Sequence, residues 1–405
     1  MEEGAIKVLL IEDNPGDARL MSEMLSEARG VFFELECAER LSTGLERLDT
    51  GDIALVLLDL SLPDSQGLET FSRVYARAPR LPIVVLTGLD DEALAVQTVH
   101  EGGQDYLVKG QVDGHSLVRA MRYAIERKRT QEQLSSYARE LRERNEQLEQ
   151  DLRMARELQL AMLPHRFPSI PPGAPLEESA VKFFSFYRPR GAVSGDLFDV
   201  IPLSDTAVGV FISDVMGHDV RAALVTAMMR ALLEKLGPVA ADPGRLLTEA
   251  NRGLARILKP MGVTMYATAF YLVADVAEGS IRFANAGHPS PLHLHLPGGS
   301  VESVGAEDKA GPAMGLFEDP VYPTCQRLIV AGDCLMLFTD GLFEVEGPNH
   351  EPYGRDRLWA EVSRRSQLPP ADLFAGLLDD VKEFSEHKEF TDDVCLLGME
   401  VTRLC

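Results

Sequence analysis

The sequence predicts a multidomain protein in which a doubly wound α/β domain with five parallel strands is joined by a long helix to an α+β sandwich. Three features predict this: alternating apolar and amphipathic stretches, then a long segment without Gly or Pro, then strands with turn signals from about Lys182. A chain of 405 residues has room for two or three domains. We expect domains at 1–122 and 166–405, with a helical linker at 123–165.

The first domain consists of five strand-then-helix units. The predicted strands are Ile6–Ile11, Phe33–Cys37, Ala54–Leu58, Ile83–Leu86 and Tyr106–Val108; the predicted helices are Asp17–Ala28, Leu41–Leu48, Leu68–Ala76, Glu92–Val99 and a stretch from Leu117 onward. In a parallel sheet of this kind, ligands bind beyond the carboxyl ends of the strands. The sequence places Glu12, Asp13, Asp59, Thr87 and Lys109 at those ends.

These five side chains predict an acidic pocket that holds one Mg²⁺ and leaves an oxygen of Asp59 exposed as a nucleophile. Lys109 and the Thr87 hydroxyl would add positive charge and a hydrogen bond for a phosphoryl group. Taken singly, Asp59 is also compatible with a helix N-cap and Lys109 with a surface lysine. Placement of all five residues at strand ends favours the pocket.

The segments VLLIEDNP, VLLDLSLPDSQGLET, PIVVLTGLDDE and QDYLVKGQ resemble the receiver domains of two-component response regulators over residues 5–125. The resemblance implies that a histidine kinase phosphorylates Asp59 and that Lys109 is the catalytic lysine. It also implies that Thr87 and Tyr106 form a switch pair. The implied Mg²⁺ site consists of Glu12, Asp13, Asp59 and the Ser61 carbonyl. Gly110 departs from the proline that many members have there, which concerns the local loop rather than the chemistry.

From Leu117 to Leu163 the chain lacks Gly and Pro and is rich in Glu, Arg, Gln and Leu. A seven-residue repeat of Leu134, Leu141, Leu148, Ala155 and Met162, with a second series of Ala138, Asn145, Leu152 and Gln159, fits a coiled coil. Asn145 in the seam favours a parallel homodimer. The alternative is a solvated helix that lies on its own domains. Pro164 ends the helix and a Pro-rich linker follows.

The C-terminal region is predicted to be an α+β sandwich with helices at Val220–Leu236, Pro243–Leu258 and Asp372–Phe384. The predicted strands are Phe183–Tyr187, Ala207–Ser213, Ala267–Val273, Ile281–Ala286, Ser290–Leu296, Cys334–Phe338 and Val394–Met399. Four acidic motifs follow or end apolar stretches: VSGDLFD, VFISDVMGHD, LMLFTDGLFE and FTDDVCLLG. Carboxylates at strand ends suit a binuclear Mg²⁺ or Mn²⁺ site that activates water for in-line attack on phosphorus. An Asp-Gly pair alone is usually only a turn, so the prediction rests on the four motifs together.

The segments ARELQLAMLP, GAVSGDLFDV, ISDVMGHDVRAAL, NAGHPSPL, LFTDGLFE and TDDVCLL resemble the PPM family of metal-dependent serine/threonine phosphatases, in the bacterial branch that acts on anti-sigma-factor antagonists. The resemblance implies that Asp214 bridges two Mn²⁺ or Mg²⁺ ions and that the Val215 carbonyl binds one of them. It further implies that Asp340 and Asp392, the latter in preference to Asp393, complete the other metal site, while Asp196 orients metal-bound water.

Two histidines remain as alternatives for a general acid: His218 in the DVMGH motif and His288 in NAGHP, either of which is also compatible with a structural role. Val193 and Ser194 stand where a double glycine is commoner, and Asp219 stands where glycine usually follows the histidine. The Asp219 substitution adds an acid beside the site and removes flexibility, so we expect it to lower activity or to alter metal affinity.

The net charge of −23 falls mainly on the two outer regions, which disfavours nucleic-acid binding. No apolar run is long enough for a membrane span, and Met1–Ala5 does not resemble a signal peptide, so we expect a cytoplasmic protein. The five cysteines, Cys37, Cys325, Cys334, Cys395 and Cys405, are scattered and are interpreted as reduced thiols. The favoured function is a response regulator in which phosphorylation of Asp59 controls the phosphatase. The alternative is an inactive phosphatase-fold adaptor that binds a sigma factor or its regulator.

Overall fold

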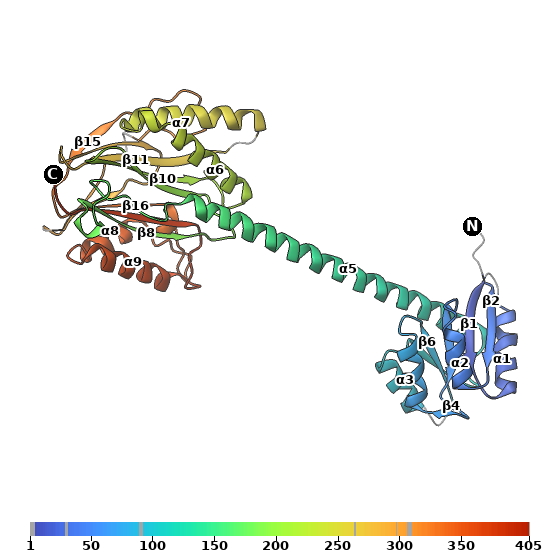
Figure 1. Ribbon diagram of the computed structural model, residues 1–405. Coiled ribbons are helices and arrows are strands. Elements are labelled where there is room, and N and C mark those ends of the chain that lie inside the picture. The colour runs from blue at the N-terminus through green and yellow to red at the C-terminus, as the bar shows by residue number, and fades with distance from the viewer. Residues whose placement is uncertain are drawn as a thin grey trace. The chain divides into compact units, whose positions relative to one another are not determined.

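The computed structural model describes residues 5–28, 31–88, 92–262, 265–296, 298–305 and 310–404. The chain divides into two compact units, Met1–Gln147 and Leu148–Cys405, with the division inside helix α5 (Gly114–Met162) (Figure 1). We describe each unit by itself. Cys405 and Met1–Gly4 lie outside the described residues; Cys37, Cys325, Cys334 and Cys395 are free thiols.

The first unit is a parallel sheet with helices on both faces, which confirms the predicted doubly wound fold. Its strands are β1 (Ile6–Ile11), β2 (Phe33–Ala38), β3 (Leu55–Asp59), β6 (Ile83–Thr87) and β7 (Asp105–Val108), in the order β2-β1-β3-β6-β7. Its helices are α1 (Pro15–Ser26), α2 (Leu41–Leu48), α3 (Leu68–Arg77), α4 (Glu92–His100) and the first turns of α5; β4 (Ser61–Leu62) and β5 (Ser65–Gln66) form a small hairpin.

Strand β1 shows how the sequence builds two cores from one sheet. Leu9 and Ile11 pack under α2, α3 and α4, whereas Val8 and Leu10 pack under α1 and α5. Successive side chains on a strand point to opposite faces, so a continuous apolar run is buried only where helices cover both sides. The carboxyl ends of the parallel strands therefore share one edge of the sheet.

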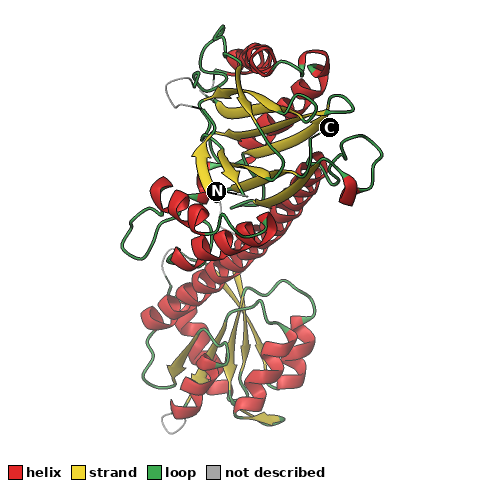
Figure 2. Cartoon of the chain, turned by 90° about the vertical axis from the view of Figure 1, so that its left-hand side faces the viewer, coloured by secondary structure: helices red, strands yellow, loops and turns green. Residues whose placement is uncertain are grey.

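The second unit consists of two antiparallel five-stranded sheets with helices on their outer faces (Figure 2). One sheet has the order β15-β12-β11-β10-β9 and the other β14-β13-β16-β17-β8. The strands are β8 (Val181–Arg188), β9 (Asp196–Pro202), β10 (Ala207–Val215), β11 (Ala267–Asp275), β12 (Ser280–Ala286), β13 (Leu292–His295), β14 (Ser300–Ser303), β15 (Cys325–Leu328), β16 (Asp333–Phe338) and β17 (Val394–Val401). The α+β sandwich is confirmed, although β9, β14 and β15 were not predicted.

Two hydrophobic layers hold this sandwich together. The larger packs α6 (Val220–Lys235) and α7 (Pro243–Leu258) on the first sheet and continues between the sheets to Leu335 and Leu397. The smaller packs the other face of the second sheet against α8 (Arg355–Arg364) and α9 (Pro370–Phe384). Helix α8 is also an addition to the predicted elements.

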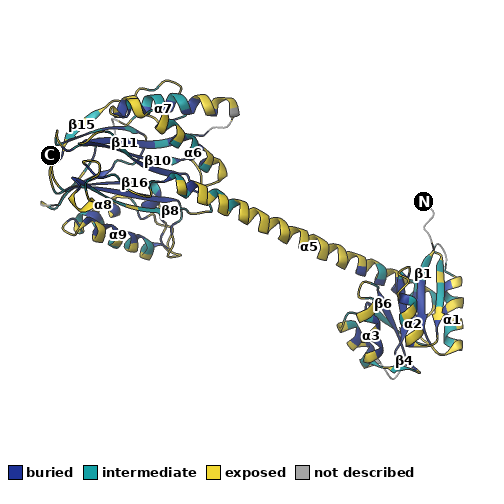
Figure 3. Cartoon of the chain, in the orientation of Figure 1, coloured by how far each residue is buried: buried dark blue, intermediate teal, exposed yellow. Residues whose placement is uncertain are grey.

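Helix α5 has different surroundings along its length (Figure 3). Leu117, Met121 and Ala124 are buried in the first unit, residues 131–151 are exposed, and Gln159 is buried in the second unit. The heptad series was wrong at Gln159, because its side chain is bonded within its own unit and is not available to a partner helix. Among the described residues, no helix combines the length and hydrophobicity that crossing a bilayer requires.

Candidate functional sites

The first unit gathers its predicted acidic pocket at the carboxyl edge of the sheet. Glu12 and Asp59 are buried there, and Lys109, directly after β7, reaches between them. The Lys109 Nζ atom lies 2.5 Å from Glu12 Oε2 and 2.7 Å from Asp59 Oδ2, and 3.2 Å from Asp17 Oδ2. Asp13 completes a group in which one oxygen each from Glu12, Asp13 and Asp59 lies within 4.8 Å of the others. The five strand-end residues therefore include a compact set of three acids around a lysine.

The negative charge of this pocket is partly compensated by Lys109. Burial raises the pKa of Glu12 to about 7, against the lowering effect of its hydrogen bond from Lys109. Burial lowers the pKa of Lys109, but hydrogen bonds to Asp59 and Glu12 outweigh burial and the net shift is upward. Lys109 therefore stays charged at neutral pH and compensates the buried carboxylates.

The remaining predicted residues of this pocket lie where the topology requires. Ser61 follows β3, and its backbone N–H donates to Asp59 Oδ1 at 3.0 Å. Thr87 ends β6 and is buried, and Tyr106 lies on the neighbouring β7, opposite Val85 of β6. The other Asp59 oxygen, Oδ2, is held by Lys109. Both oxygens of Asp59 thus have donors that would stabilise charge on a group attached to them.

In the second unit, Asp196 and Asp214 are direct cross-strand partners. Asp196 begins β9 and pairs with Asp214 of β10 in the antiparallel register, so their Cβ atoms are about 5 Å apart. Asp196 is buried and Asp214 is half-buried. Two motifs that are separated in the sequence therefore place their carboxyl groups side by side at one end of the first sheet.

The other two acidic motifs belong to the second sheet and are tied to Asp196. Asp340 begins a single 3₁₀ turn (Asp340–Leu342) after β16, and the preceding Thr339 donates its hydroxyl hydrogen to Asp196 Oδ2 at 2.8 Å. Asp393, just before β17, accepts the backbone N–H of Gly195 and that of Arg190, each at 2.7 Å. These hydrogen bonds bring the four motifs together between the sheets.

Two glycines permit this close approach. A Cβ at Gly195 would lie 2.5 Å from the Val215 carbonyl oxygen, and a Cβ at Gly341 would lie 1.9 Å from the Asp393 carbonyl oxygen. Neither space accommodates a side chain, since the obstructing atoms belong to the backbone. The glycines of the SGD and TDG sequences thus allow motifs on different strands to pack against each other.

The environment of these carboxyl groups fits divalent cations. Burial and the neighbouring Asp214 charge raise the pKa of Asp196 well above its usual range. Burial, followed by the charges of Asp340 and Asp392, raises the pKa of Asp214 to about 7, and burial together with Glu344 and Asp392 raises that of Asp340 to about 6. Carboxylate oxygens that destabilise one another's ionised forms are a donor set suited to Mg²⁺ or Mn²⁺.

Asp392 and Asp393 have different surroundings. Both Asp393 oxygens accept backbone hydrogen bonds, so this side chain fastens the segment 190–195. Asp392 is half-buried, and its Oδ1 accepts only the N–H of Asp393 among the hydrogen bonds that the structure describes. The geometry therefore leaves Asp392 freer to bind a cation, in line with the preference for Asp392 over Asp393.

The two candidate histidines also differ. His218 is exposed in the turn before α6. His288 is buried, its Nδ1 lies 2.8 Å from Thr268 Oγ1, and burial lowers its pKa to about 3. A neutral buried imidazole is a poor proton donor, so His288 has a structural role here.

The unusual Asp219 has a local role that the sequence pattern did not predict. It is the N-cap of α6: its carboxylate accepts the backbone N–H groups of Arg221 and Ala222, and it forms an ion pair with the Arg221 guanidinium. A capping carboxylate also interacts favourably with the positive end of the helix dipole. The added acid is thus largely compensated.

Three contributors to this site were missed. Glu344, in the same LFTDGLFE motif as Asp340, raises the pKa of both Asp340 and Asp214 by its charge. Thr339 orients Asp196, and Gln159 of α5 bonds to both backbone groups of Ser194: its Oε1 accepts the Ser194 N–H at 2.9 Å and its Nε2 donates to the Ser194 carbonyl at 2.6 Å. Each had a signal in the sequence: Thr339 and Glu344 belong to the LFTDGLFE motif, and Gln159 belongs to the ARELQLAMLP segment.

Comparison with known proteins agrees with this geometry. Residues 8–122 match the family model of the response regulator receiver domain, and residues 204–402 match that of Stage II sporulation protein E (SpoIIE). Phosphoserine phosphatase RsbP of Bacillus subtilis is 28% identical over 228 residues, which are 56% of this chain and 54% of RsbP. Phosphoserine phosphatase RsbU of the same organism is 21% identical over 254 residues, 62% of this chain and 71% of RsbU.

The chain thus spans about half the length of RsbP. Among solved structures, the SiaA-PP2C domain of Pseudomonas aeruginosa superposes with a TM-score of 0.54 at 22% identity, covering 63% of this chain and 98% of that domain, which is a likeness of fold. Together with the receiver pocket and the four converging acidic motifs, these matches show that the chain has an N-terminal response regulator receiver domain and a C-terminal phosphatase domain of the SpoIIE and PPM type.

Proposed function

We propose that this protein is a metal-dependent phosphatase of phosphoserine or phosphothreonine proteins, controlled by phosphorylation of Asp59. The observation that carries the proposal is the convergence of Asp196, Asp214, Asp340 and Asp392, with Asp214 opposite Asp196 in the strand register and Asp196 held by Thr339. The two relatives named phosphoserine phosphatase support the same chemistry.

In this proposal Asp214, the Val215 carbonyl, Asp340 and Asp392 would hold two Mg²⁺ or Mn²⁺ ions. Such ions activate water at neutral pH and neutralise the phosphoryl oxygens. Asp196 accepts a hydrogen bond from the attacking water and orients it, while its own position is fixed by the Thr339 hydroxyl. Exposed His218 is the remaining candidate for protonating the leaving serine oxygen.

We further propose that the receiver pocket binds one Mg²⁺ through Glu12, Asp13, Asp59 and the Ser61 carbonyl. Asp59 takes the phosphoryl group from a histidine kinase, and Lys109 stabilises the charge of that group. Thr87 and Tyr106, on neighbouring strands, would transmit the change. The free thiols of the described cysteines suit the reducing cytoplasm, which is where we place the protein.

The last turns of α5 offer a route by which regulation reaches Asp196. Gln159 bonds to the N–H and the carbonyl of Ser194, and its Nε2 lies 3.2 Å from Thr226 Oγ1 of α6. The Ser194 hydroxyl in turn accepts the Asp196 N–H at 3.0 Å. A rotation or shift of this helix would therefore move the backbone that presents Asp196, which is a population shift through a rigid element.

A parallel homodimer through α5 is part of the proposal. Leu134, Leu141 and Leu148, at seven-residue spacing, are between 59% and 64% exposed. Leucines with this spacing pack against a partner helix in a coiled coil, and Asn145 would fix the register. Because Gln159 is occupied in its own unit, we confine the seam to the exposed stretch before it. A solution mass near that of one chain, with and without a phosphoryl mimic, would contradict the dimer.

The test is Mn²⁺-dependent hydrolysis of a serine-phosphorylated anti-sigma-factor antagonist, with and without beryllofluoride on the receiver. We expect turnover in the wild type, a changed rate with beryllofluoride, and no beryllofluoride response in Asp59→Asn. Asp214→Asn serves as the inactive control. Absence of turnover with metal bound, for several antagonists, would replace this proposal by the adaptor function.

A further inference from the structure

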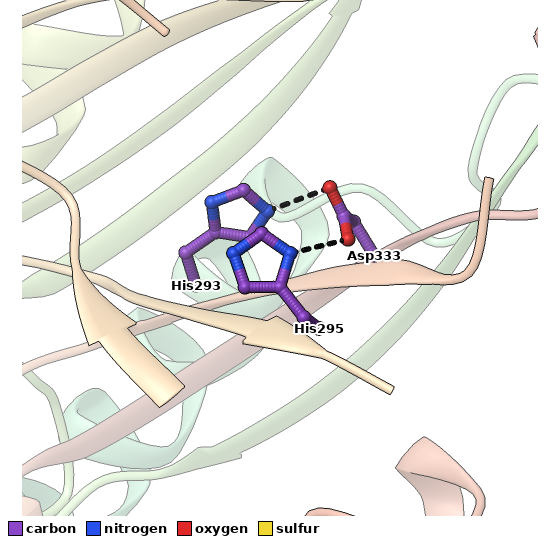
Figure 4. A group of neighbouring side chains, drawn as sticks. All are labelled: His293, His295 and Asp333. Atoms are coloured by element: carbon purple, nitrogen blue, oxygen red, sulfur yellow. Dashed lines mark hydrogen bonds and ion pairs between the residues drawn. The ribbon is translucent and has the colours of Figure 1, made fainter. Parts of the chain in front are cut away.

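A second group of metal-binding side chains lies in the C-terminal unit, away from the four acidic motifs. His293 and His295 belong to β13, and Asp333 is the first residue of β16 (Figure 4). His295 and Asp333 are direct cross-strand partners, and His293, two residues earlier, shares their face of the sheet. Asp340 follows the opposite end of β16, so the group of three is separated from the acidic site by the length of that strand.

The three side chains converge on the Asp333 carboxylate. His293 Nε2 lies 2.8 Å from Asp333 Oδ2, and His295 Nδ1 lies 2.8 Å from Asp333 Oδ1. Figure 4 shows each imidazole turning one nitrogen toward the carboxylate. The ring centroids are 4.1 Å apart, and one ligand atom from each residue lies within 4.8 Å of the others. Two nitrogens and one oxygen thus surround a common point.

The location is unusual for polar groups. The side chains of His293 and Asp333 are 0% and 1% exposed, whereas that of His295 is 29% exposed. Leu335, on the same face of β16, belongs to the hydrophobic layer between the two sheets. Polar groups in such a layer destabilise the fold unless they are fully bonded.

Hydrogen bonds do not fully satisfy this group. Asp333 is well provided for, since the Val330 N–H also donates to it at 2.8 Å. His293 Nδ1, however, is buried without a partner among the described residues. This orphan nitrogen is not the one that faces Asp333, so the case for an ion rests on the convergence of the other two ring nitrogens on one buried carboxylate.

We propose that His293, His295 and Asp333 bind one divalent transition-metal ion of the zinc type. Each imidazole supplies the nitrogen that now faces Asp333, and Asp333 supplies an oxygen. Imidazole nitrogen with one carboxylate is the donor set of Zn²⁺ and its neighbours, and its bonds of about 2.0–2.2 Å need only a small spreading of the present contacts. Water completes the coordination from the partly exposed side of His295.

Proton positions are compatible with this binding. When the metal takes the nitrogen that faces Asp333, each imidazole carries its proton on the other ring nitrogen, and the Asp333 carboxylate offsets one of the two charges of the ion. His293 Nδ1 lacks a hydrogen-bond partner with and without the metal. The free-energy cost of burying this nitrogen is therefore the same in both states and does not disfavour metal binding. The bound ion cross-links β13 to β16 and fixes the turn at Val330 through Asp333.

The two sites of this unit would sort metals by donor chemistry. The acidic motifs offer oxygens alone and suit Mg²⁺ or Mn²⁺, whereas this site offers two nitrogens. Excess Mg²⁺ therefore occupies the acidic site and leaves the nitrogen site to zinc. This difference gives the experiment its selectivity, and the outcome does not depend on phosphatase activity.

The test measures Zn²⁺ and Co²⁺ uptake by the full chain, stripped with a chelator and then held in excess Mg²⁺. We expect one zinc ion per chain, a higher unfolding temperature with zinc, and visible absorption typical of tetrahedral cobalt that zinc removes. His295→Ala should weaken zinc binding at least about tenfold. His350→Ala, at an exposed histidine paired with Glu346, is the matched control and should bind zinc as the wild type does.

The cobalt spectrum of the wild type needs no variant, so a folding defect in His295→Ala cannot decide the question. No zinc uptake in excess Mg²⁺, or equal uptake by the wild type and His295→Ala, would overturn the proposal. In either case the three residues would be a hydrogen-bonded link between β13 and β16.

Discussion

The two units both collect carboxyl groups at a sheet edge, but they compensate the negative charge differently. In the first unit, Lys109 lies within 2.7 Å of both Glu12 and Asp59. In the second unit, within the ranges that the structure describes, neither Lys nor Arg pairs with Asp196, Asp214, Asp340 or Asp392. Among the described residues, the first pocket contains a cation and the second does not.

This difference indicates whether each acidic site needs an added cation to offset the charge of its carboxyl groups. Lys109 places a positive charge 2.7 Å from Oδ2 of the buried Asp59. The pKa of Asp214, raised to about 7 by burial and by Asp340, shows the cost of gathering acids without a cation. We therefore expect bound metal to stabilise the second unit far more than the first.

The largest expected effect is at Asp214. Replacement by Asn removes a charge that the proposed metals share, so we expect turnover to fall by more than about 100-fold. Metal affinity measured by calorimetry should fall with it. Asp205→Asn, in the exposed bend before β10, is the matched control and should retain wild-type values. Equal activity of the two variants would remove Asp214 from the mechanism.

The next effect concerns the built-in cation. Lys109→Met removes the ammonium group that contacts Glu12 and Asp59, so the charge of a phosphoryl group attached to Asp59 is less well stabilised. We expect phosphorylation of Asp59 by a small-molecule donor to slow at least about tenfold, with a matching loss of beryllofluoride affinity. Lys7→Met, at a surface ion pair with Asp52, should have no such effect. Unchanged phosphorylation of Lys109→Met would contradict the claim that Lys109 compensates the negative charge in the first pocket.

Local pattern predicted most of the fold because the strands are short apolar runs separated by amphipathic helices or turn residues. The run VLLI of β1 is apolar on both faces, which is the signature of a parallel strand under two helical layers. Strand β9 was not predicted although it is rich in apolar residues, because Asp199 interrupts its apolar run and Pro202 ends it. Short edge strands such as β14 and β15 carry little apolar pattern.

The acids of the candidate site could be predicted, but the groups that hold them could not. Gln159 meets Ser194 across 35 residues of sequence, and Thr339 meets Asp196 across 143. Such contacts depend on how α5 and the two sheets pack together, and neither spacing nor residue type reveals the partners. For the same reason, the heptad spacing placed Gln159 in a coiled-coil seam, whereas in the folded protein Gln159 bonds to Ser194.

A smaller effect separates the adjacent Asp392 and Asp393. Asp393→Asn loses a charged acceptor of two backbone N–H groups, so the free energy of unfolding should fall by about 1.5–3 kcal/mol while two metals still bind. Asp392→Asn should do the reverse, weakening metal binding without destabilising the metal-free protein, because it relieves repulsion at Asp340. Denaturant unfolding and metal titration of both variants measure this. A shared loss of metal binding would make both aspartates ligands.

The smallest expected effect tests whether a protonated His288 supplies positive charge to the second site. It contacts Thr268, the cross-strand partner of Asp214, so a protonated ring there would balance the acids. Burial instead lowers its pKa to about 3, below the value near 6.5 in the unfolded chain. Between these values only the unfolded chain takes up the proton, so stability falls as pH decreases, by at most about 1.4 kcal/mol per pH unit.

The carboxyl groups whose pKa values are raised act with the opposite sign, since the folded state takes up their protons first and gains stability as pH falls. The difference between wild type and His288→Gln isolates the histidine, because the acids are common to both. We expect the stability advantage of the wild type to shrink between pH 7 and pH 5 in urea unfolding measurements. An advantage that grows over this range would mean that His288 is protonated in the folded protein, and the second site would then contain a cation as the first one does.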